Sequence, residues 1–391
     1  MKKKLLFVNG HLNIGGVERS LVDLLKHIDF TLYEVDLVLF EDIGDYADEL
    51  PEEVNILFYD LTKTYGPFIR CIVNGIKAGN WFSFWFRLIL LFSKNTNVKL
   101  LALAKPLFKL NKRYDCAIAY RVGICTDFVA YIANSEKKVT WWHHGEYNLS
   151  PKLTKNLNKT YKRFDNIVTV SEGCNDFFRD RFTRLNNKLV SIPNIIDYET
   201  IRKKAVETGS FDIEENDYIV LVSMGRLSPE KGMLNCVHAC KRLIDNGYEV
   251  KWFLIGDGEQ RSEIEALIDN YGIENHISLL GNILNPYPYI KKARIYVHPS
   301  HVESLSIAVL EALALNTPVV VARSMGPAEY IRDKENGLLV DATPEGLYEG
   351  IVSLITDKNL YNRLKENNSE DLQHYKPGFV INKVYGLVGE T

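Results

Sequence analysis

Two glutamates, Glu303 and Glu311, are separated by seven residues in the segment HVESLSIAVLEALAL. Apolar residues recur at helical spacing from Leu305 onward, which predicts a loop at Glu303 and a helix that contains Glu311 about two turns in. At a rise of 1.5 Å per residue, the two carboxylates stand roughly 12 Å apart. An extended nucleotide-sugar has a similar distance between its sugar and its ribose, so the hydroxyls of both rings could donate to a carboxylate.

Free backbone amides lie between the two glutamates, at the start of the predicted helix. A helix N-terminus carries partial positive charge, and its first amides have no partner within the helix. The amides of Ser304, Leu305 and Ser306 could therefore bind a phosphate. The segment as a whole predicts a site for a nucleotide-sugar whose diphosphate lies between its two rings.

Two cations follow another apolar strand, in the segment GRLSPEKG. Gly225 ends the strand, and Arg226 and Lys231 lie in the loop that leads to the next helix. Cations at this place suit the charge on a diphosphate leaving group. A solvated loop with surface ion pairs explains such a pair equally well. The diphosphate interpretation gains weight because Gly256 and Asp257 follow the next strand at an equivalent position.

Two histidines, His143 and His144, follow the apolar strand in KVTWWHHGEY. A histidine here could donate a hydrogen bond to a sugar hydroxyl or a phosphate and could stabilise charge in the transition state. For a single histidine, a buried ring that bonds to backbone is the commoner case. Adjacent side chains on a strand point to opposite faces, so only one of the two is expected at the site.

A glycine pair, Gly15 and Gly16, stands between the first strand and the first helix in NGHLNIGGVERSL. Glycine lets the backbone approach a ligand closely, and the start of a helix favours an anion. The pair does not form GxGxxG, and glycines at such a place often serve only the turn. Both interpretations of the pair stay open.

The chain lacks the sequence patterns of metal-dependent and hydrolytic sites. No Asp-x-Asp pair occurs, and the histidines show no metal-ligand spacing. We therefore expect no metal and no cofactor, with amides and the two cations binding the diphosphate. Gly-x-Ser-x-Gly and a P-loop are also absent, which argues against a serine hydrolase and a kinase-like NTPase.

The 391 residues allow two domains, and a composition of 46% hydrophobic and 25% charged residues is that of a globular protein. The six cysteines show no CxxC spacing, which favours reduced thiols in a cytoplasmic protein. The start of the chain has too few apolar residues for a signal peptide. The most apolar window, residues 81–92, is shorter than the roughly eighteen residues that a membrane-spanning helix needs.

Short β-branched runs alternate with helical segments in two series along the chain. Such alternation predicts parallel sheets covered by helices on both faces. We therefore expect an α/β protein with two Rossmann-like domains that face each other across a cleft. The first domain comprises residues 1–193 and the second residues 194–371, and a C-terminal helix within 372–391 returns to the first domain. Ligands bind at the carboxyl ends of such strands, which is where the polar residues above stand.

Residues 62–114 contain ten basic residues, interleaved tryptophan and phenylalanine, and no Asp or Glu. This composition predicts peripheral contact with an anionic membrane, at about 1 kcal/mol for each basic residue near the surface. The alternative is a helical subdomain that packs its apolar side on the sheet and keeps its lysines solvated. Nucleic-acid binding is not expected, because no recognition motif accompanies the charge.

Taken together, these residues resemble the family-4 retaining glycosyltransferases of GT-B fold, in particular bacterial capsule and exopolysaccharide enzymes. The resemblance is carried by NIGGVERSL, VSIPNIID, GRLSPEKG, FLIGDG, LLGNILNPYPYIKKARIYVHPS, VESLSIAVLEALALNTPVV and NGLLV. It is dense across residues 218–341 and sparser before them. The chain departs from the commoner family pattern at residues 304–306, where a glycine-containing turn is frequent.

By position, the resemblance implies that Glu303 binds hydroxyls of the donor sugar and that Glu311 binds those of the ribose. It also implies that Arg226 and Lys231 neutralise the diphosphate, that one of the two adjacent histidines lies near the reacting sugar, and that residues 280–282 lie near the nucleobase. The other residues of the expected donor site are Gly15, Gly16, Gly225, Gly256, Asp257, Leu280, Asn282, Ser304, Leu305 and Ser306.

We therefore expect a cytoplasmic enzyme, peripheral at the inner face of the cell membrane, that transfers a hexosyl or N-acetylhexosaminyl unit. The donor would be a UDP-sugar bound by the second domain, and the acceptor a growing, lipid-linked polysaccharide or cell-surface glycan bound by the first. Retention of anomeric configuration follows from the resemblance alone. The alternatives are a catalytically idle homologue that acts as a partner, and another enzyme of the same fold, such as a nucleotide-sugar epimerase or a phosphorylase. A dinucleotide-dependent dehydrogenase fits poorly, because GxGxxG is missing.

Overall fold

The structure is a computed structural model that describes residues 1–59 apart from residue 42, and residues 112–144, 149–207, 218–366 and 370–389. It also describes residues 85, 88, 89, 102, 103, 105, 106, 108 and 110. The predicted membrane-contact segment, residues 62–114, thus lies mostly outside the described residues. The chain divides into two compact units: unit 1 comprises Met1–Ile195 with Val380–Thr391, and unit 2 comprises Ile196–Phe379.

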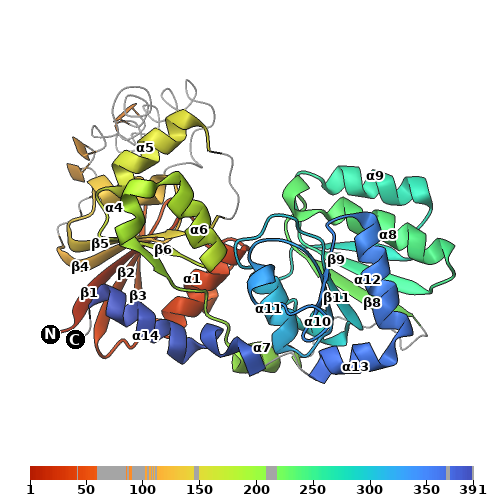
Figure 1. Cartoon of the computed structure of the whole chain (residues 1–391). Helices are drawn as coiled ribbons and strands as arrows, with labels where there is room; N and C mark the ends of the chain where they lie inside the picture. Colours follow the sequence, from red (N-terminus) through yellow and green to blue (C-terminus); the bar gives the residue numbers. More distant parts are fainter. Residues whose placement is uncertain are drawn as a thin grey trace. The chain divides into compact units, whose positions relative to one another are not determined.

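The described part of unit 1 contains a parallel sheet of seven strands in the order β3-β2-β1-β4-β5-β6-β7 (Figure 1). Its strands are short apolar runs, because a parallel sheet covered by helices is buried on both faces. The strands are β1 (Lys3–Val8), β2 (Tyr33–Leu39), β3 (Val54–Phe58), β4 (Tyr114–Ala119), β5 (Ser135–Trp142), β6 (Asn166–Thr169) and β7 (Leu189–Ser191). The helical elements are α1 (Gly16–Lys26), η1 (Ala47–Glu49), α4 (Ile124–Tyr131), α5 (Pro151–Tyr161), α6 (Glu172–Arg181) and η3 (Thr183–Lys188).

The described part of unit 2 contains a second parallel sheet, of six strands in the order β10-β9-β8-β11-β12-β13. The strands are β8 (Ile219–Met224), β9 (Val250–Ile255), β10 (Ile277–Gly281), β11 (Ile295–His298), β12 (Val319–Ala322) and β13 (Leu338–Val340). The helical elements are α7 (Tyr198–Lys204), η4 (Pro229–Lys231), α8 (Met233–Asp245), α9 (Arg261–Tyr271), α10 (Tyr287–Lys292), α11 (Ile307–Ala314), η5 (Pro327–Glu329), α12 (Pro344–Thr356), α13 (Lys358–Glu366) and η6 (Glu370–Tyr375). The two sheets confirm the predicted α/β class with two Rossmann-like domains.

Alternation along β11 separates the two faces of the sheet in unit 2. Ile295 and Val297 belong to the apolar core that also contains Cys236 of α8 and Ile351 of α12. Successive side chains of a strand point to opposite faces, so Tyr296 and His298 belong to the other face. Helices α10 and α11 pack against β8 and β11 as well as against each other. The carboxyl end of β11 therefore delivers His298 to the layer that contains α11.

The last helix, α14 (Pro377–Val388), carries the chain from unit 2 back to unit 1. In unit 1 the ring of Tyr385 stacks on that of Tyr33 with centroids 5.1 Å apart, and the Tyr385 hydroxyl accepts a hydrogen bond from the Asp29 amide over 2.8 Å. Near the end of the helix, the Lys3 ammonium donates to the Gly389 carbonyl over 3.0 Å. The predicted return of a C-terminal helix to the first domain is thus confirmed.

The unit boundaries differ slightly from residues 193 and 372, where the sequence predicts them. Residues 372–379 lie in unit 2 because their backbone is bonded there. The Tyr198 hydroxyl donates to the Leu372 carbonyl over 3.1 Å, and the Ile196 amide donates to the Tyr375 carbonyl over 2.8 Å. Tyr375 also packs edge-on against Tyr330, with ring centroids 5.8 Å apart.

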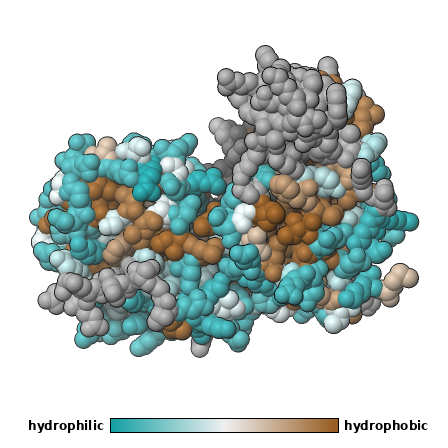
Figure 2. Space-filling view, turned by 180° about the vertical axis from the view of Figure 1, so that it is seen from behind, coloured by the Kyte–Doolittle hydropathy of each residue, from teal (hydrophilic) through white to brown (hydrophobic). Residues whose placement is uncertain are grey.

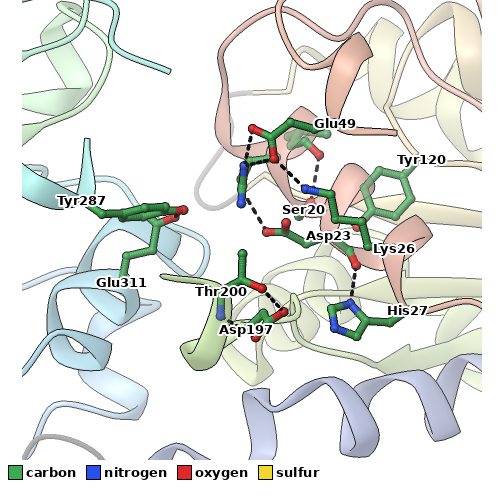
Figure 3. A network of polar contacts seen from close by, with 12 residues as sticks. Ser20, Asp23, Lys26, His27, Glu49, Tyr120, Asp197, Thr200, Tyr287 and Glu311 are labelled. Carbon is green, nitrogen blue, oxygen red and sulfur yellow. Dashed lines mark hydrogen bonds and ion pairs between the residues drawn. The ribbon is translucent and has the colours of Figure 1, made fainter. Parts of the chain in front are cut away.

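A buried network of charges joins α1 to η1 in unit 1 (Figure 3). The Arg19 guanidinium donates to Asp23 over 3.1 Å and to both carboxylate oxygens of Glu49, over 3.0 and 3.1 Å. The Lys26 ammonium reaches the same Glu49 carboxylate over 2.6 Å. Burial raises the pKa of Asp23, and the charges of Arg19 and Lys26 act against that rise. The network satisfies charges that would otherwise be costly to bury.

Within each of the two lobes that Figure 2 shows, apolar residues gather toward the middle and hydrophilic residues lie around them. Among the described residues, no helix is long and apolar enough to cross a membrane.

Candidate active site

Glu303 lies in the loop that follows β11, and the residue is 8% exposed. The Lys231 ammonium, at the end of η4, donates to its Oε1 over 2.6 Å. The Nε2 atom of His298 lies 2.9 Å from the same oxygen. Two residues that the sequence assigns to different parts of the ligand, Glu303 and Lys231, are therefore in direct contact.

The charge state of Glu303 follows from these contacts. Burial acts to raise the pKa of Glu303, but the Lys231 ammonium and the His298 hydrogen bond outweigh it and hold the pKa well below its usual range. The side chain is thus a carboxylate that only accepts hydrogen bonds. Sugar hydroxyls are donors that such a group can bind.

The loop that carries Arg226 and Lys231 is tied down by polar contacts. The Ser228 hydroxyl donates to the Glu230 carboxylate over 2.7 Å, and the Ser300 hydroxyl donates to the Glu230 carbonyl over 3.1 Å. Arg226 is exposed, and its guanidinium forms no ion pair or hydrogen bond with any residue that the structure describes. One cation of the predicted pair therefore binds a carboxylate of the protein, and the other points to solvent.

Glu311 lies just over one turn into α11 and is 5% exposed. The Tyr287 hydroxyl, from α10, donates to Glu311 Oε1 over 2.8 Å (Figure 3). The sequence predicts about two turns of helix before Glu311. The helix begins later, at Ile307, because Ser306 has a φ of 67° and leaves the helical region. The spacing expected for an unbroken helix from Glu303 onward therefore does not apply.

Residues 304–306 form the turn between β11 and α11. Ser306 caps α11 in the left-handed region that favours glycine, at the place where the resemblance leads one to expect a glycine-containing turn. The Tyr330 hydroxyl lies within 2.9 Å of the Leu305 carbonyl and 3.2 Å of the Ser306 carbonyl. The Gly326 amide donates to the Glu303 carbonyl over 3.1 Å. These hydrogen bonds hold the strained turn in one backbone conformation.

The glycines after β8 and β9 bring two strand ends into contact. A Cβ on Gly256, whose φ is 134°, would stand 2.0 Å from the Gly225 carbonyl oxygen, so only glycine fits there. The Gly256 amide donates to the Gly281 carbonyl over 2.8 Å. The adjacent Asp257 is exposed, and Asn282 after β10 is exposed as well, whereas Leu280 is half-buried. The predicted residues of β8, β9 and β10 thus gather at one edge of the sheet.

The two histidines of unit 1 point away from each other, as strand alternation predicts. His143 packs on Tyr120, with ring centroids 4.8 Å apart, and His144 packs on Trp142, with centroids 5.5 Å apart. Burial lowers the pKa of His143 to about 3, with a smaller contribution from the charge of His144. Burial also lowers the pKa of His144. The Nε2 atom of His143 is buried and has no partner among the described residues.

The glycine pair of unit 1 lies under an acidic side chain. A Cβ on Gly15 would stand 2.5 Å from Glu18 Oε2, whereas Gly16 has open space around its Cα. Glu18 Oε1 accepts a hydrogen bond from Arg121 over 2.7 Å, and the same guanidinium nitrogen lies 2.6 Å from Nε2 of His11. The start of α1 thus already holds a carboxylate, which is paired with a guanidinium.

Sequence reasoning missed several residues of both units. In unit 2 these are Tyr287, His298 and Tyr330, and in unit 1 they are His11, Glu18 and Arg121. His11, Arg121 and His298 stand at or just after the ends of β1, β4 and β11, which is the signal that could have found them. Among the described residues, no group of three or more histidine, cysteine or acidic side chains could hold a metal ion. The expectation of a metal-free site stays a prediction.

Comparisons with known proteins find glycosyltransferases similar to this chain in sequence and in fold. Residues 207–371 match the family model described as "Glycosyl transferases group 1". The chain superposes on Anabaena HepE, solved in complex with UDP and glucose, with a TM-score of 0.73 and 18% identity over 99% of both chains. The chain has the GT-B fold. The match includes Arg226, Lys231, Glu303 and Glu311.

Two curated relatives of this GT-B protein have named activities. It is 34% identical over 174 residues to the lipopolysaccharide core biosynthesis glycosyltransferase LpsE of Rhizobium meliloti, a match that covers 44% of this chain and 50% of LpsE. It is 27% identical over 92% of both chains to an N-acetylgalactosaminyltransferase of Campylobacter jejuni, whose name specifies a diphospho-undecaprenol-linked glycan. The chain spans about half the length of LpsE and of one further curated relative.

Proposed function

We propose that this protein is a retaining glycosyltransferase of family 4 that moves a hexosyl or N-acetylhexosaminyl unit from a UDP-sugar to a growing, lipid-linked glycan. The observation that carries the proposal is the environment of Glu303. Its carboxylate is buried and ionised, and Lys231 and His298 share its Oε1. A buried carboxylate fixed by two donors at the end of a strand is suited to bind and orient sugar hydroxyls.

The charges of unit 2 suit the rest of such a donor. Arg226 is an exposed guanidinium that could pair with the diphosphate, and Lys231 lies five residues further along the same loop. Glu311, which Tyr287 orients, would accept hydrogen bonds from the ribose. Support for UDP comes from HepE, which was solved with UDP and glucose.

The reaction would proceed on one face of the donor sugar. The bond between the anomeric carbon and the diphosphate oxygen breaks, and a bond forms between that carbon and the acceptor hydroxyl oxygen. The acceptor proton passes to the departing diphosphate oxygen, so the configuration is retained without a covalent sugar–enzyme intermediate. Lys231 and Arg226 would stabilise the charge that develops on the diphosphate.

A lipid-linked acceptor is proposed because the Campylobacter relative is named for a glycan on diphospho-undecaprenol. Unit 1 would bind this acceptor, and the basic and aromatic residues 62–114 would bring the protein to an anionic membrane. This would place the protein in the cytoplasm, at the inner face of the membrane, in the synthesis of a capsule or another surface polysaccharide.

A panel of UDP-sugars tests the donor assignment. Incubation of the purified protein with radiolabelled UDP-glucose, UDP-galactose and their N-acetylated forms, with undecaprenyl-diphosphate oligosaccharide as acceptor, is expected to give a labelled lipid-soluble product from at least one donor. Epimerised UDP-sugar without acceptor would favour a nucleotide-sugar epimerase. Neither binding nor turnover of any nucleotide-sugar would favour an idle homologue that acts as a partner.

A further inference from the structure

His298 ends strand β11 and is 2% exposed, yet no part of the reaction above requires a histidine there. Its ring stacks on Tyr296 at an interplanar angle of 18°. Its Nε2 atom lies 2.9 Å from Glu303 Oε1 and 3.0 Å from the Ser306 hydroxyl oxygen. His298 thus joins the sugar-binding carboxylate to the turn that starts α11.

The direction of these hydrogen bonds follows from the charge on Glu303. An ionised carboxylate only accepts, so Nε2 of His298 must carry a proton. The single N–H then points toward both Glu303 and Ser306, and the Ser306 oxygen acts as an acceptor. The Nδ1 atom of His298 is buried and has no partner among the described residues. An unpaired buried polar atom destabilises the fold, and an apolar side chain at this position would avoid that cost.

A second cost lies at Ser306. Its φ of 67° is in the left-handed region, which strains a residue other than glycine. Glycine would relieve this strain but would lose the oxygen that His298 contacts. Two unfavourable features therefore surround one carboxylate, and strain of this kind clusters at functional sites.

The two oxygens of Glu303 differ in what they contact. Oε1 receives both Lys231 and His298, whereas Oε2 has no hydrogen-bond or ion-pair partner among the residues that the structure describes. With one oxygen held by two donors, the plane of the carboxylate is fixed. The other oxygen stays open to a hydrogen bond from a ligand.

We propose that His298 and Ser306 are positioning residues that fix Glu303 so that its Oε2 receives a hydroxyl of the donor sugar. This inference rests on the proposed function of Glu303. Neither residue touches the reacting atoms. They act by restricting the carboxylate to one orientation, which lowers the entropy lost when the donor reaches its reactive geometry.

Two substitutions of His298 separate this role from a structural one. In His298→Gln the side-chain amide can present an N–H near the place of Nε2, whereas the shorter amide of His298→Asn cannot reach it. We expect kcat with the donor to fall at least tenfold in His298→Asn, and His298→Gln to stay within about threefold of the unsubstituted protein. Equal losses in both variants, or no loss in either, would overturn the proposal. His238→Asn is the matched control, because its Nδ1 contacts the Tyr271 hydroxyl between α8 and α9.

Ser306→Ala and Ser306→Gly separate the hydroxyl from the backbone. Both remove the oxygen that His298 contacts, but only glycine relieves the positive φ. We expect the two variants to lose kcat to a similar extent, with Ser306→Gly melting at a higher temperature than Ser306→Ala. If kcat of Ser306→Gly equals that of the unsubstituted protein, the Ser306 hydroxyl does not position Glu303.

A measurement without substrate keeps this inference distinct from the proposed function. Carbon-13 NMR of glutamate carboxylates, assigned with Glu303→Gln, reports the titration of Glu303 directly. We expect His298→Asn to raise the pKa of Glu303 and His298→Gln to restore it. Failure of every nucleotide-sugar to react would count against the proposed function, whereas an unchanged titration in His298→Asn would count against the positioning role itself.

Discussion

Lys231 and Glu303 form an ion pair with 2.6 Å between the ammonium nitrogen and Oε1. The lysine side chain is 26% exposed and the glutamate side chain 9% exposed. The Lys231 ammonium thus binds a buried carboxylate on one side, and its exposed side can still bind an anionic ligand. A loop after β8 and a loop after β11 are joined by this contact.

The acid sensitivity of the fold should reflect this ion pair. The pKa of Glu303 is depressed in the folded protein, so its ionisation stabilises the fold above the pKa of an unfolded glutamate, about 4.3. That contribution is lost as the pH falls below that value toward the folded pKa. The excess free energy of unfolding of the unsubstituted protein over Glu303→Gln should therefore shrink between pH 5 and the lowest pH at which both fold. Urea titrations across this range measure it, and a difference independent of pH would contradict the assigned charge state.

Tyr287→Phe should weaken donor binding more than it weakens the fold. The variant removes the hydrogen bond to Glu311 Oε1, and a bond to a charged group contributes about 1.5–3 kcal/mol. We expect KM for the donor to rise roughly tenfold, since about 1.4 kcal/mol corresponds to that factor. Tyr271→Phe, which removes a hydroxyl that contacts His238 on α8, is the matched control. Similar KM values for both variants would show that Tyr287 has no part in binding the ribose.

His143 should make the fold less stable in mild acid. The pKa of His143 is lowered to about 3, against about 6.5 in an unfolded chain. Between these pH values the unfolded chain binds a proton at His143 and the folded protein does not. His143 therefore does not reduce the free energy of unfolding above pH 6.5, and reduces it progressively as the pH drops from there toward 3. Replacing the titrating ring with His143→Asn should flatten this part of the pH profile of unfolding. The same slope in both proteins would show that His143 is protonated in the fold.

Arg19→Ala should destabilise unit 1 by about 3 kcal/mol, because breaking a buried ion pair leaves its partners unpaired. Arg19 is 6% exposed and neutralises both Asp23 and Glu49. Lys26→Ala removes a cation that is 27% exposed and serves as the control, with an expected loss below about 1 kcal/mol. Equal losses of free energy of unfolding would mean that burial of Arg19 does not govern the network.

The order of strands and helices could be predicted because each parallel strand is a short apolar run between turn signals. Glu303, Lys231 and Glu311 could be located for the same reason, since each follows or flanks such a run. Spacing alone cannot show that Lys231 contacts Glu303, because that contact depends on how two loops far apart in the sequence meet. The helix start at Ile307 was also beyond prediction, because Ser306 adopts a φ that is uncommon for serine.

His298 illustrates the other limit of sequence reasoning. It stands at the end of the strand in RIYVHPS, a place where polar residues are candidates for function. Its apolar neighbours, however, are typical of a buried strand residue. Its importance depends on burial and on a bond that reaches five residues further along the chain. Tyr287 and Tyr330 were missed similarly, because aromatic residues in apolar segments usually belong to the core.

The proposed function requires Lys231 and Glu303 to bind and activate a nucleotide-sugar. Initial rates of sugar transfer, measured for the unsubstituted protein and for purified, folded Lys231→Ala, test it most directly. We predict a loss of kcat of about a hundredfold or more, as for other groups that stabilise developing charge, with the same far-ultraviolet circular dichroism spectrum. An unchanged transfer rate in folded Lys231→Ala would contradict the account.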